Sequence, residues 1–497
     1  MNGRWHDYLD AQIAARPAAL AVTDSVGTHW DFAGLDAACR EITDLLRAKG
    51  VQAGDRVMLV TENSGAGMAS VFACSRMGAI VSPINARQTA GELTKLMEHA
   101  RPAAMLFASA VSPDAKAHAE RLGAEPISGA FGEMHLSTPY DSDPDDLPDV
   151  AVLLYTTGTT GAPKGVMLTH GNLRFGGQSS ANSRAIVAGD KIYGVLPMTH
   201  VFGLTSMITA ATVAGAHIHF EARFSAARLY EALNNGVTLF SGVPQMHALL
   251  MQYAREQGHE KLPGKTLRYV SSGAAPLDPA WKRKAEAFYG LPLQNGFGMT
   301  ETTAGATVTH SEIGDPDTSC GPALPGTALK IDEDVPGGGD GVGEVLCKGP
   351  NIMKGYYKNA EATAAVLDAE GWLRTGDLGK IDDQNRLHIV GRSKELIIHG
   401  GFNVYPPEVE AAINDHPKVI QCAVIGRRKG GDEEVLAFVQ AAPDDMPDVE
   451  ELRAFAAERL TGYKRPKRII VATELPAAPT GKILKHKLLE AFADKLD

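Results

Sequence analysis

The chain has 497 residues, 44% of them hydrophobic and 22% charged, which is ordinary for a globular protein and too long for one domain of usual size. A formal net charge of -11 and the lack of a basic block exclude a broad nucleic-acid-binding surface. The five cysteines form no Cys-x-x-Cys pair, so they indicate neither a disulfide framework nor a zinc site, and they favour a reducing cytoplasm.

Short apolar runs alternate with helical patterns through the first part of the chain. The runs "RVMLV", "AIVSPI" and "AAMLF" read as strands, whereas "GMASVFACSRMG" and "AGELTKLMEHA" read as helices. This alternation is typical of βα units with parallel sheets, so we expect an α/β fold. The N-terminal segment "MNGRWHDYLD" contains acidic residues and no apolar run, and therefore does not resemble a secretory signal.

A loop rich in glycine and threonine follows the apolar run Ala151–Tyr155, which reads as a buried strand. In "YTTGTTGAPKGVMLTH", Gly158, Gly161 and Pro163 would break a helix. Converging backbone N–H groups, hydroxyls and the charge of Lys164 suit a polyanion such as triphosphate. The Walker pattern is excluded, because no serine or threonine follows the lysine directly. A solvated linker is the alternative, but the preceding strand and a helix expected to start within "GVMLTHGNL" favour the anion site.

The segment Ile192–Phe220 carries no formal charge and could suggest a membrane span. It contains Pro197 and three histidines, and its continuously apolar part is shorter than the ~20 residues that a bilayer requires. We therefore expect no membrane span, but a buried helix next to a pocket.

The pattern changes after the glycine-rich, hairpin-like connector Gly337–Gly343, where segments become shorter and turns more frequent. A smaller unit begins near Gly391–Glu410 and ends in a lysine-rich tail. Because this tail alternates charged and apolar residues, we expect Lys485 and Lys487 on the solvated face of an amphipathic helix.

Five motifs follow one another along the chain. They are "YTTGTTGAPKG", "NGFGMTET" (Asn295–Thr302), "RTGD" (Arg374–Asp377), "GRSKELIIHGGFNVYPPEVE" (Gly391–Glu410) and "PTGKILK" (Pro479–Lys485). In this order they resemble the adenylate-forming superfamily, the AMP-dependent synthetases and ligases, which includes acyl-CoA synthetases, amino-acid adenylation domains and luciferases. The resemblance spans nearly the whole chain. It implies a large N-terminal adenylation domain of α/β sheets with a β-rich subdomain, residues 1–392, and a small mobile α+β C-terminal domain, residues 393–497.

The chemistry that this resemblance implies is an ATP-dependent ligation in two half-reactions. A carboxylate attacks the α-phosphate of ATP and gives acyl-AMP and pyrophosphate, and the thiol of coenzyme A then takes the acyl group and releases AMP. Two anions meet in the first step, so Mg²⁺ and cationic side chains are needed. The implied cofactors are ATP, Mg²⁺ and coenzyme A.

The resemblance also assigns residues to the nucleotide. Glu301 is implied as a magnesium ligand together with Thr157, and Thr300 as a contact of the α-phosphate. Phe297 falls where most relatives have a tyrosine over the adenine ring. The other residues implied to bind the nucleotide are Thr156, Gly158, Thr159, Thr160, Lys164, Gly273, Ala274, Ala275, Asn295, Gly296, Gly298, Asp377 and Arg392. Without the resemblance, Thr300 and Glu301 would read as a helix N-cap with a first-turn acid, and Asp377 as a turn former.

Lys482 in "PTGK" is implied as the catalytic lysine that bridges the substrate carboxylate and the α-phosphate. His200 falls where relatives place a histidine beside the carboxylate, although a histidine among apolar residues is more often part of a core. Lys394 occupies the position about which relatives rotate the small domain. After that rotation, Gly400 and Gly401 would leave a narrow passage for the pantetheine of coenzyme A.

The acid itself is the least defined part of the prediction. The implied pocket positions are His200–Leu204, Met246, "SSGAAPL" and Thr302–Gly305. These are apolar or small with no obvious cation, which favours a fatty, aryl or other monocarboxylic acid. A malonate-type diacid is the alternative, with an arginine such as Arg223 entering from elsewhere. A non-catalytic nucleotide-binding homologue is a second alternative, against which the presence of both Glu301 and Lys482 argues. The resemblance leaves a homodimer open.

Overall fold

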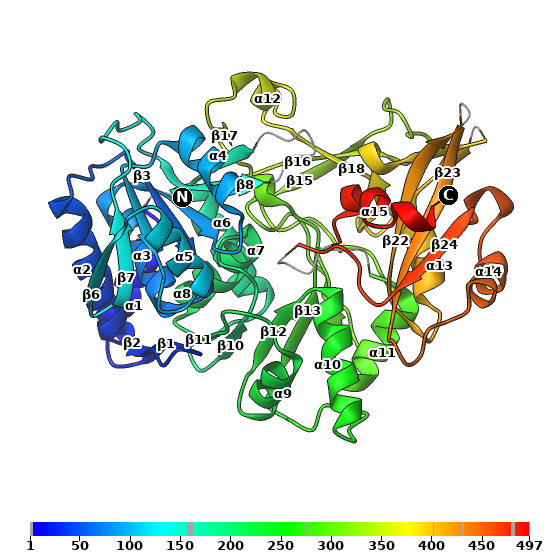
Figure 1. Ribbon diagram of the computed structural model, residues 1–497, viewed down its shortest axis with the longest axis horizontal. Coiled ribbons are helices and arrows are strands. Elements are labelled where there is room, and N and C mark those ends of the chain that lie inside the picture. The colour runs from blue at the N-terminus through cyan, green and yellow to red at the C-terminus, as the bar shows by residue number, and fades with distance from the viewer. Residues whose placement is uncertain are drawn as a thin grey trace.

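The computed structural model describes residues 3–156, 163–274, 277–400, 402–429, 432–478 and 483–496. In Figure 1 the N-terminal elements, blue to cyan, lie on one side, and the C-terminal elements, orange to red, lie on the other. The middle of the chain, in green, forms the lower centre of the view.

Two sheets form the N-terminal part: a mainly parallel seven-stranded sheet, and an eight-stranded sheet with a parallel centre and antiparallel strands at both edges. With the helices between the strands, they confirm the expected α/β fold. The eight-stranded sheet contains, in order, β17 (Gly355–Tyr356), β9 (Lys164–Thr169), β8 (Val150–Thr156), β4 (Ile80–Asn85), β3 (Arg56–Thr61), β5 (Ala104–Phe107), β7 (Gly132–Ser137) and β6 (Glu125–Gly129), and its parallel centre is β8, β4, β3 and β5. The seven-stranded sheet contains β14 (Leu293–Gln294), β13 (Tyr269–Ser272), β12 (Leu239–Gly242), β10 (Lys191–Gly194), β11 (His217–Phe220), β1 (Leu20–Asp24) and β2 (His29–Asp31).

Helices connect and cover these strands. They are α1 (Asp7–Ala15), α2 (Phe32–Ala48), α3 (Gly65–Met77), α4 (Ala90–Ala100), α5 (Pro113–Arg121), α6 (His170–Ser183), α7 (Val201–Gly203), α8 (Ala210–Ala214), α9 (Ala226–Asn234), α10 (Pro244–Glu256) and α11 (Pro279–Tyr289). A π-helical segment, η1 (Leu204–Thr209), joins α7 to α8.

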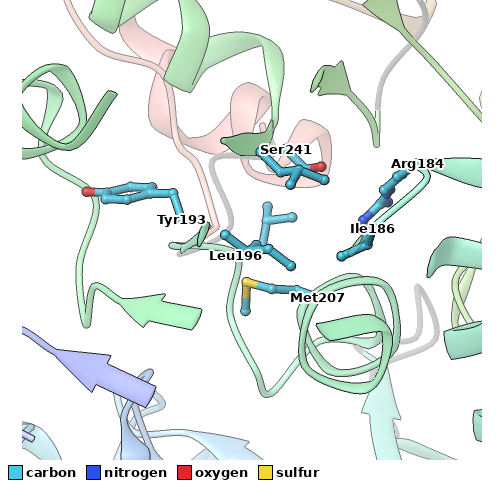
Figure 2. A pocket seen from close by; sticks show the side chains of 8 residues that line it. Arg184, Ile186, Tyr193, Leu196, Met207 and Ser241 are labelled. Carbon is cyan, nitrogen blue, oxygen red and sulfur yellow. The ribbon is translucent and has the colours of Figure 1, made fainter. Parts of the chain in front are cut away.

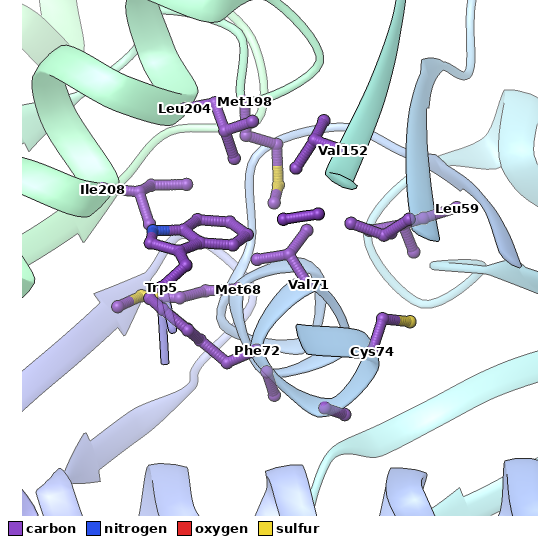
Figure 3. Close-up of a cluster of buried hydrophobic side chains, with 14 of the residues drawn as sticks. Trp5, Leu59, Met68, Val71, Phe72, Cys74, Val152, Met198, Leu204 and Ile208 are labelled. Atoms are coloured by element: carbon purple, nitrogen blue, oxygen red, sulfur yellow. The ribbon is translucent and has the colours of Figure 1, made fainter. Parts of the chain in front are cut away.

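Helix α3 lies in the largest hydrophobic cluster, which also includes residues from strands of both sheets. Its residues from Gly65 to Ser75 are all buried, because the helix is apolar or small on every side. Figure 3 shows Trp5 beside Phe72 of α3, and the ring centroids are 4.9 Å apart. The Trp5 indole N–H donates to Thr209 Oγ1 at 3.0 Å. One aromatic side chain thus joins the N-terminal segment to η1 and α3.

A four-stranded antiparallel sheet follows, and it corresponds to the expected β-rich subdomain. Its strands are, in order, β15 (Ala328–Asp332), β16 (Gly343–Lys348), β18 (Leu373–Ile381) and β19 (Leu387–Arg392), with the short helix α12 (Ala360–Ala364) between β17 and β18. Strands β15 and β16 pair antiparallel on either side of the glycine-rich connector, as the sequence predicts.

The C-terminal elements have hydrophobic clusters of their own, drawn from residues between Ile397 and Leu496. They are the hairpin β20 (Ile397–His399) and β21 (Phe402–Val404), the sheet β22 (Val419–Lys429), β23 (Asp432–Ala441) and β24 (Arg468–Ala472), and the helices α13 (Pro406–Asn414), α14 (Val449–Ala457) and α15 (Lys485–Ala491). The domain boundary after residue 392 stays a prediction.

The segment after the glycine and threonine loop differs from the expectation. We expected a helix to start within "GVMLTHGNL", but Lys164–Thr169 is strand β9, and helix α6 begins only at His170. Strand β9 pairs antiparallel with β8, with Thr156 opposite Lys164. A short apolar run has no periodicity that separates a strand from a helix, so its pairing partner decided the outcome.

The uncharged segment Ile192–Phe220 folds as expected in part. It contains strands β10 and β11, and between them η1 and α8 are largely buried. In the part of the chain that the structure describes, no helix combines the length and the hydropathy needed to cross a bilayer.

Lys485 is not on a solvated face, so that expectation was wrong, although Lys487 is exposed. The Lys485 ammonium lies 2.8 Å from both Glu395 Oε2 and Glu410 Oε1. Burial acts to lower the pKa of Lys485, but the two carboxylates raise it above its ordinary value. The sequence could not show this, because Glu395 and Glu410 approach only in the folded chain.

We predict that Trp5→Ala lowers the free energy of unfolding by about 3–5 kcal/mol, since it leaves a cavity between α1, α3 and η1. Urea unfolding followed by circular dichroism measures the effect. The control is Val187→Ala at a residue that is 57% exposed, which should change stability by less than about 0.5 kcal/mol. Equal midpoints for the two variants would contradict the role given to Trp5.

Candidate active site

Three non-glycine residues near the predicted nucleotide motifs have left-handed backbone conformations. Ala274 follows β13 with φ 69°, and Thr303 and Ala304 have φ values of 51° and 81° directly after η2 (Thr300–Thr302), a single 3₁₀ turn. Such conformations cost of order 1–3 kcal/mol each and concentrate at functional sites. The strain marks the ends of β13 and η2 as a candidate site.

The segment from residue 295 to 305 folds back tightly on itself. A Cβ atom on Gly298 would lie 1.6 Å from the Ala304 carbonyl oxygen, and one on Gly296 would lie 2.6 Å from that of Thr307. Only glycine allows the backbone to approach so closely. Phe297 N–H donates to Thr307 Oγ1 at 2.9 Å. The two glycines therefore shape the turn that presents Asn295 and Phe297.

Asn295 is buried and has one unused hydrogen-bonding atom. Its Nδ2 donates to the Ser319 carbonyl oxygen at 3.2 Å, whereas Oδ1 has no hydrogen-bond partner among the described residues. A buried acceptor without a donor costs free energy, and the amino group of an adenine could supply that donor. The Phe297 ring packs against the cluster around Cys320 beside the four-stranded sheet. These residues fit the predicted adenine site.

Asp377 and Arg392 lie opposite each other on β18 and β19. The two form an ion pair, with 3.0 Å between Arg392 Nε and Asp377 Oδ1, and Asp377 is 4% exposed. Pairing with arginine orients the carboxylate. The structure thus brings together two residues that the resemblance assigned to the nucleotide.

Glu301 is a buried carboxylate at the centre of η2. The Tyr356 hydroxyl donates to Glu301 Oε1 at 2.8 Å. Glu301 forms no ion pair with any other described residue. A buried charge without a counterion is unfavourable, so a divalent cation with oxygen ligands suits this position. Thr300, the predicted α-phosphate contact, is buried in the same turn.

Lys164 lies next to the same tyrosine. Its ammonium is 4.9 Å from the centroid of the Tyr356 ring, and it forms no ion pair with another described residue. The strand pairing places Lys164 opposite Thr156 at the end of β8. Tyr356 was missed at the sequence level, because nothing in "KGYYKN" distinguishes a tyrosine that will contact Glu301 and Lys164 from one in a core.

His200 is exposed and precedes α7. Its Nδ1 accepts a hydrogen bond from Phe202 N–H at 3.2 Å, which orients the ring. A Cβ atom on Gly273 would lie 3.0 Å from the Phe202 ring, so this ring packs on the backbone after β13. His200 is therefore not part of a core, and Phe202 links its turn to the segment that contains Gly273.

Several predicted residues lie outside the described parts of the chain. These are Thr157, Gly158, Thr159, Thr160, Ala275, Gly401 and Lys482. Lys394 is exposed in the 3₁₀ turn η3 (Ser393–Glu395). Gly400, at φ 59°, is exposed on the β20–β21 hairpin and donates its N–H to Asp432 of the C-terminal sheet at 3.0 Å. The structure does not bring Gly400 to the residues predicted to bind the nucleotide.

A narrow pocket lies between η1 and strands β10 and β12, with room for about one water molecule. Figure 2 shows Leu196, Met207 and Ser241 around it, with Arg184 and Ile186 at one side. Ser241 Oγ shares a hydrogen bond with Ser271 Oγ of β13 at 2.8 Å. The pocket is therefore connected through this bond to the strand that leads to Gly273.

The arginine at this pocket is Arg184, which the sequence analysis did not select. It donates to the Ser206 carbonyl oxygen, and its guanidinium carbon lies 5.7 Å from the centroid of the Tyr269 ring. The arginine suggested from sequence, Arg223, instead forms ion pairs with Glu62 at 2.9 Å and with Asp114 at 2.7 Å. Two carboxylates thus already balance the charge of Arg223.

Comparison with known families gives two matches. The family model of the AMP-binding enzyme matches residues 9–357, and that of the AMP-binding enzyme C-terminal domain matches residues 408–482. Together these matches cover most of the chain.

Individual proteins match over nearly their full length. A feruloyl-CoA synthase from Amycolatopsis is 33% identical over 96% of both chains, and a long-chain-fatty-acid–CoA ligase from Mycobacterium tuberculosis is 31% identical over 95% of both. Among solved structures, ATP-bound MatB from Rhodopseudomonas palustris has a TM-score of 0.85 at 30% identity over 100% of both chains. The o-succinylbenzoate CoA synthetase of Bacillus subtilis, in complex with its acyl-adenylate, has a TM-score of 0.81 at 28% identity over 97% of both.

Proposed function

The chain belongs to the family of AMP-binding enzymes, and on that premise we propose that its substrate is a monocarboxylic acid, which it joins to coenzyme A. The chain is an AMP-forming acid–thiol ligase that uses ATP, Mg²⁺ and coenzyme A. A non-catalytic role is therefore set aside. The observation that carries the site assignment is the buried Glu301 without a counterion, which shares Tyr356 with Lys164.

In the proposed first half-reaction, the chain holds ATP by its adenosine and its phosphates. Asn295 Oδ1 accepts from the adenine, and Asp377 accepts from the ribose hydroxyls with Arg392 beside it. Glu301 would hold Mg²⁺, which when bound would supply positive charge that stabilises the phosphates. Lys164, with Thr156 and the loop residues through Thr160, holds the phosphates that leave as pyrophosphate.

Lys482 is proposed to act where the acid meets the α-phosphate. Its ammonium would neutralise the two anions as the carboxylate oxygen forms the new bond to phosphorus. His200, oriented by Phe202 N–H, is proposed to lie beside the acid. These roles rest on the sequence motifs, and for His200 also on its orientation next to Gly273.

The second half-reaction needs a different arrangement. The thiol of coenzyme A attacks the acyl carbon and AMP leaves, so Lys482 must withdraw to make room. Rotation about Lys394, an exposed residue between the two regions, is proposed to bring Gly400 and Gly401 to the site. Gly400 at present contacts Asp432, which supports its assignment to a face used only after rotation.

The predicted acid-binding positions, which include His200–Leu204, Met246 and Thr302–Gly305, are apolar or small, and this supports a monocarboxylic acid with an apolar body. The small pocket beside η1 has room for about one water molecule, and Ile186, Leu196, Met207 and Leu239 contribute apolar surface to it. One observation favours a second candidate, a diacid. Arg184 reaches the pocket and has no ion pair among the described residues, so its guanidinium could bind a second carboxylate.

We predict that pyrophosphate release with ATP, Mg²⁺ and coenzyme A is fastest with aryl or fatty monocarboxylic acids. The test compares such acids with malonate and longer diacids in wild type and in Arg184→Met. The apolar lining should favour the monoacids, and Arg184→Met should leave their rates within a few-fold. If wild type releases pyrophosphate only with diacids, and Arg184→Met loses this activity, the diacid proposal replaces the monoacid proposal.

We predict that Lys482→Ala slows acyl-AMP formation by about 10²–10³-fold, the scale of removing one preorganised electrostatic group. Thioester formation from supplied acyl-AMP should change little, because the lysine has withdrawn by then. Single-turnover assays of each half-reaction measure this, with Lys487→Ala, at an exposed position of the same tail, as control. Equal losses in both half-reactions would contradict the assignment.

We predict that Lys164→Ala weakens ATP binding but leaves binding of a non-hydrolysable acyl-AMP analogue nearly unchanged, because that ligand lacks the β- and γ-phosphates. Asp377→Ala should weaken both ligands, since both contain the ribose. Calorimetric titration of the two variants with the two ligands gives the comparison. Equal losses of affinity for ATP and for the acyl-AMP analogue in Lys164→Ala would mean that this lysine shapes the whole site.

A further inference from the structure

We propose that Tyr356 is a positioning residue that holds Glu301 and Lys164 close to each other and prevents them from forming an ion pair. The inference rests on the proposed function, in which Glu301 holds Mg²⁺ and Lys164 binds the phosphates. The Tyr356 side chain thereby keeps the charges of Glu301 and Lys164 available for the metal–triphosphate complex.

The hydroxyl of Tyr356 fixes one side of the Glu301 carboxylate. It donates to Oε1 at 2.8 Å, and both residues are 7% exposed. No described residue donates a hydrogen bond to Oε2. A neutral phenol can orient a carboxylate without cancelling its charge.

The ring of Tyr356 contacts the ammonium of Lys164. The ammonium lies 4.9 Å from the ring centroid, within the range of a cation–π interaction. This contact holds the long side chain in place and leaves its full charge. A carboxylate in the same position would neutralise the ammonium, and in a buried setting the attraction of such a pair is strong. Glu301 and Lys164 contact Tyr356 and form no ion pair with each other.

Backbone hydrogen bonds fix the tyrosine between the two segments. In β17, Tyr356 pairs with Val166 of β9, two residues after Lys164. Tyr357 N–H donates to the Gly165 carbonyl oxygen at 2.7 Å, and Met353 N–H donates to that of Glu301 at 2.9 Å. The same short stretch is thus bonded to the lysine strand and to the glutamate turn, and its geometry sets the separation of the two charges.

A tyrosine in this cluster could also be ordinary core packing. Substitutions that remove the hydroxyl alone, or the hydroxyl and the ring together, distinguish a positioning role from core packing. Tyr356→Phe keeps the ring near Lys164 and removes the hydroxyl on Glu301, whereas Tyr356→Leu removes both contacts. Tyr357→Phe is the matched control, because the Tyr357 hydroxyl donates to Asp145 Oδ2 at 2.7 Å and belongs to a different hydrophobic cluster.

The experiment measures Mn²⁺ binding by electron paramagnetic resonance in the presence of a non-hydrolysable ATP analogue. Tyr356→Phe should weaken Mn²⁺ binding about tenfold, the lower end for loss of a group that orients a metal ligand. Binding of the analogue without metal should be unchanged in Tyr356→Phe and weakened in Tyr356→Leu. Tyr357→Phe should match wild type in both assays, and melting temperatures report whether each variant is folded.

Wild-type Mn²⁺ affinity in Tyr356→Phe would overturn the proposal, and so would an equal loss in Tyr357→Phe. Equal analogue binding by Tyr356→Phe and Tyr356→Leu without metal would overturn the part that concerns Lys164. The variant Glu301→Gln tests the proposed function separately. If Glu301→Gln binds Mn²⁺ as wild type does, Glu301 is not the metal ligand, and the failure belongs to the assignment of the site.

Discussion

Opposite charges attract strongly in a buried environment, and an active site that needs both must keep them apart. Around Tyr356 this constraint is met by geometry. The ring lies against Lys164 and the hydroxyl against Glu301, and the strands β9 and β17 fix the distance between them. The left-handed residues Thr303 and Ala304 hold the turn that contains Glu301. The strained backbone after η2 and the pairing of β9 with β17 thus both keep Glu301 and Lys164 in fixed positions.

The two large sheets provide the rigid support for this arrangement. Helix α3 and Trp5 fill the cluster to which both sheets contribute, so the ends of their strands keep fixed positions. The smaller sheet adds Asp377 and Arg392 as a preformed pair. Groups from distant parts of the sequence therefore meet on one framework, and groups that are positioned in advance lower the reorganisation cost of electrostatic catalysis.

Much of this organisation could be predicted from sequence because it resides in local patterns. The βα alternation predicted the fold. The motifs selected Asn295, Asp377 and Arg392, whose neighbours in the chain determine their turns and strands, while their roles at the nucleotide stay predictions. The failures involve partners that the chain brings together only on folding. Strand β9 exists because β8 lies beside it. Lys485 is enclosed because Glu395 and Glu410 approach it, and Tyr356 contacts a glutamate from a remote turn. No periodicity in the sequence encodes such contacts.

The ion pairs of Lys485 couple two movements of the proposed domain rotation. Glu395 directly follows Lys394, the proposed pivot, and Lys485 begins helix α15, three residues after Lys482, the proposed catalytic lysine. Because the partly buried Lys485 ammonium pairs with Glu395 and with Glu410 of α13, these two places are tied together. The proposed rotation of the small domain would then withdraw Lys482 and bring the hairpin to the site in one event. Enzyme molecules partway between the two half-reactions would be scarce, and an activated acyl group would meet its thiol before water had long to reach it.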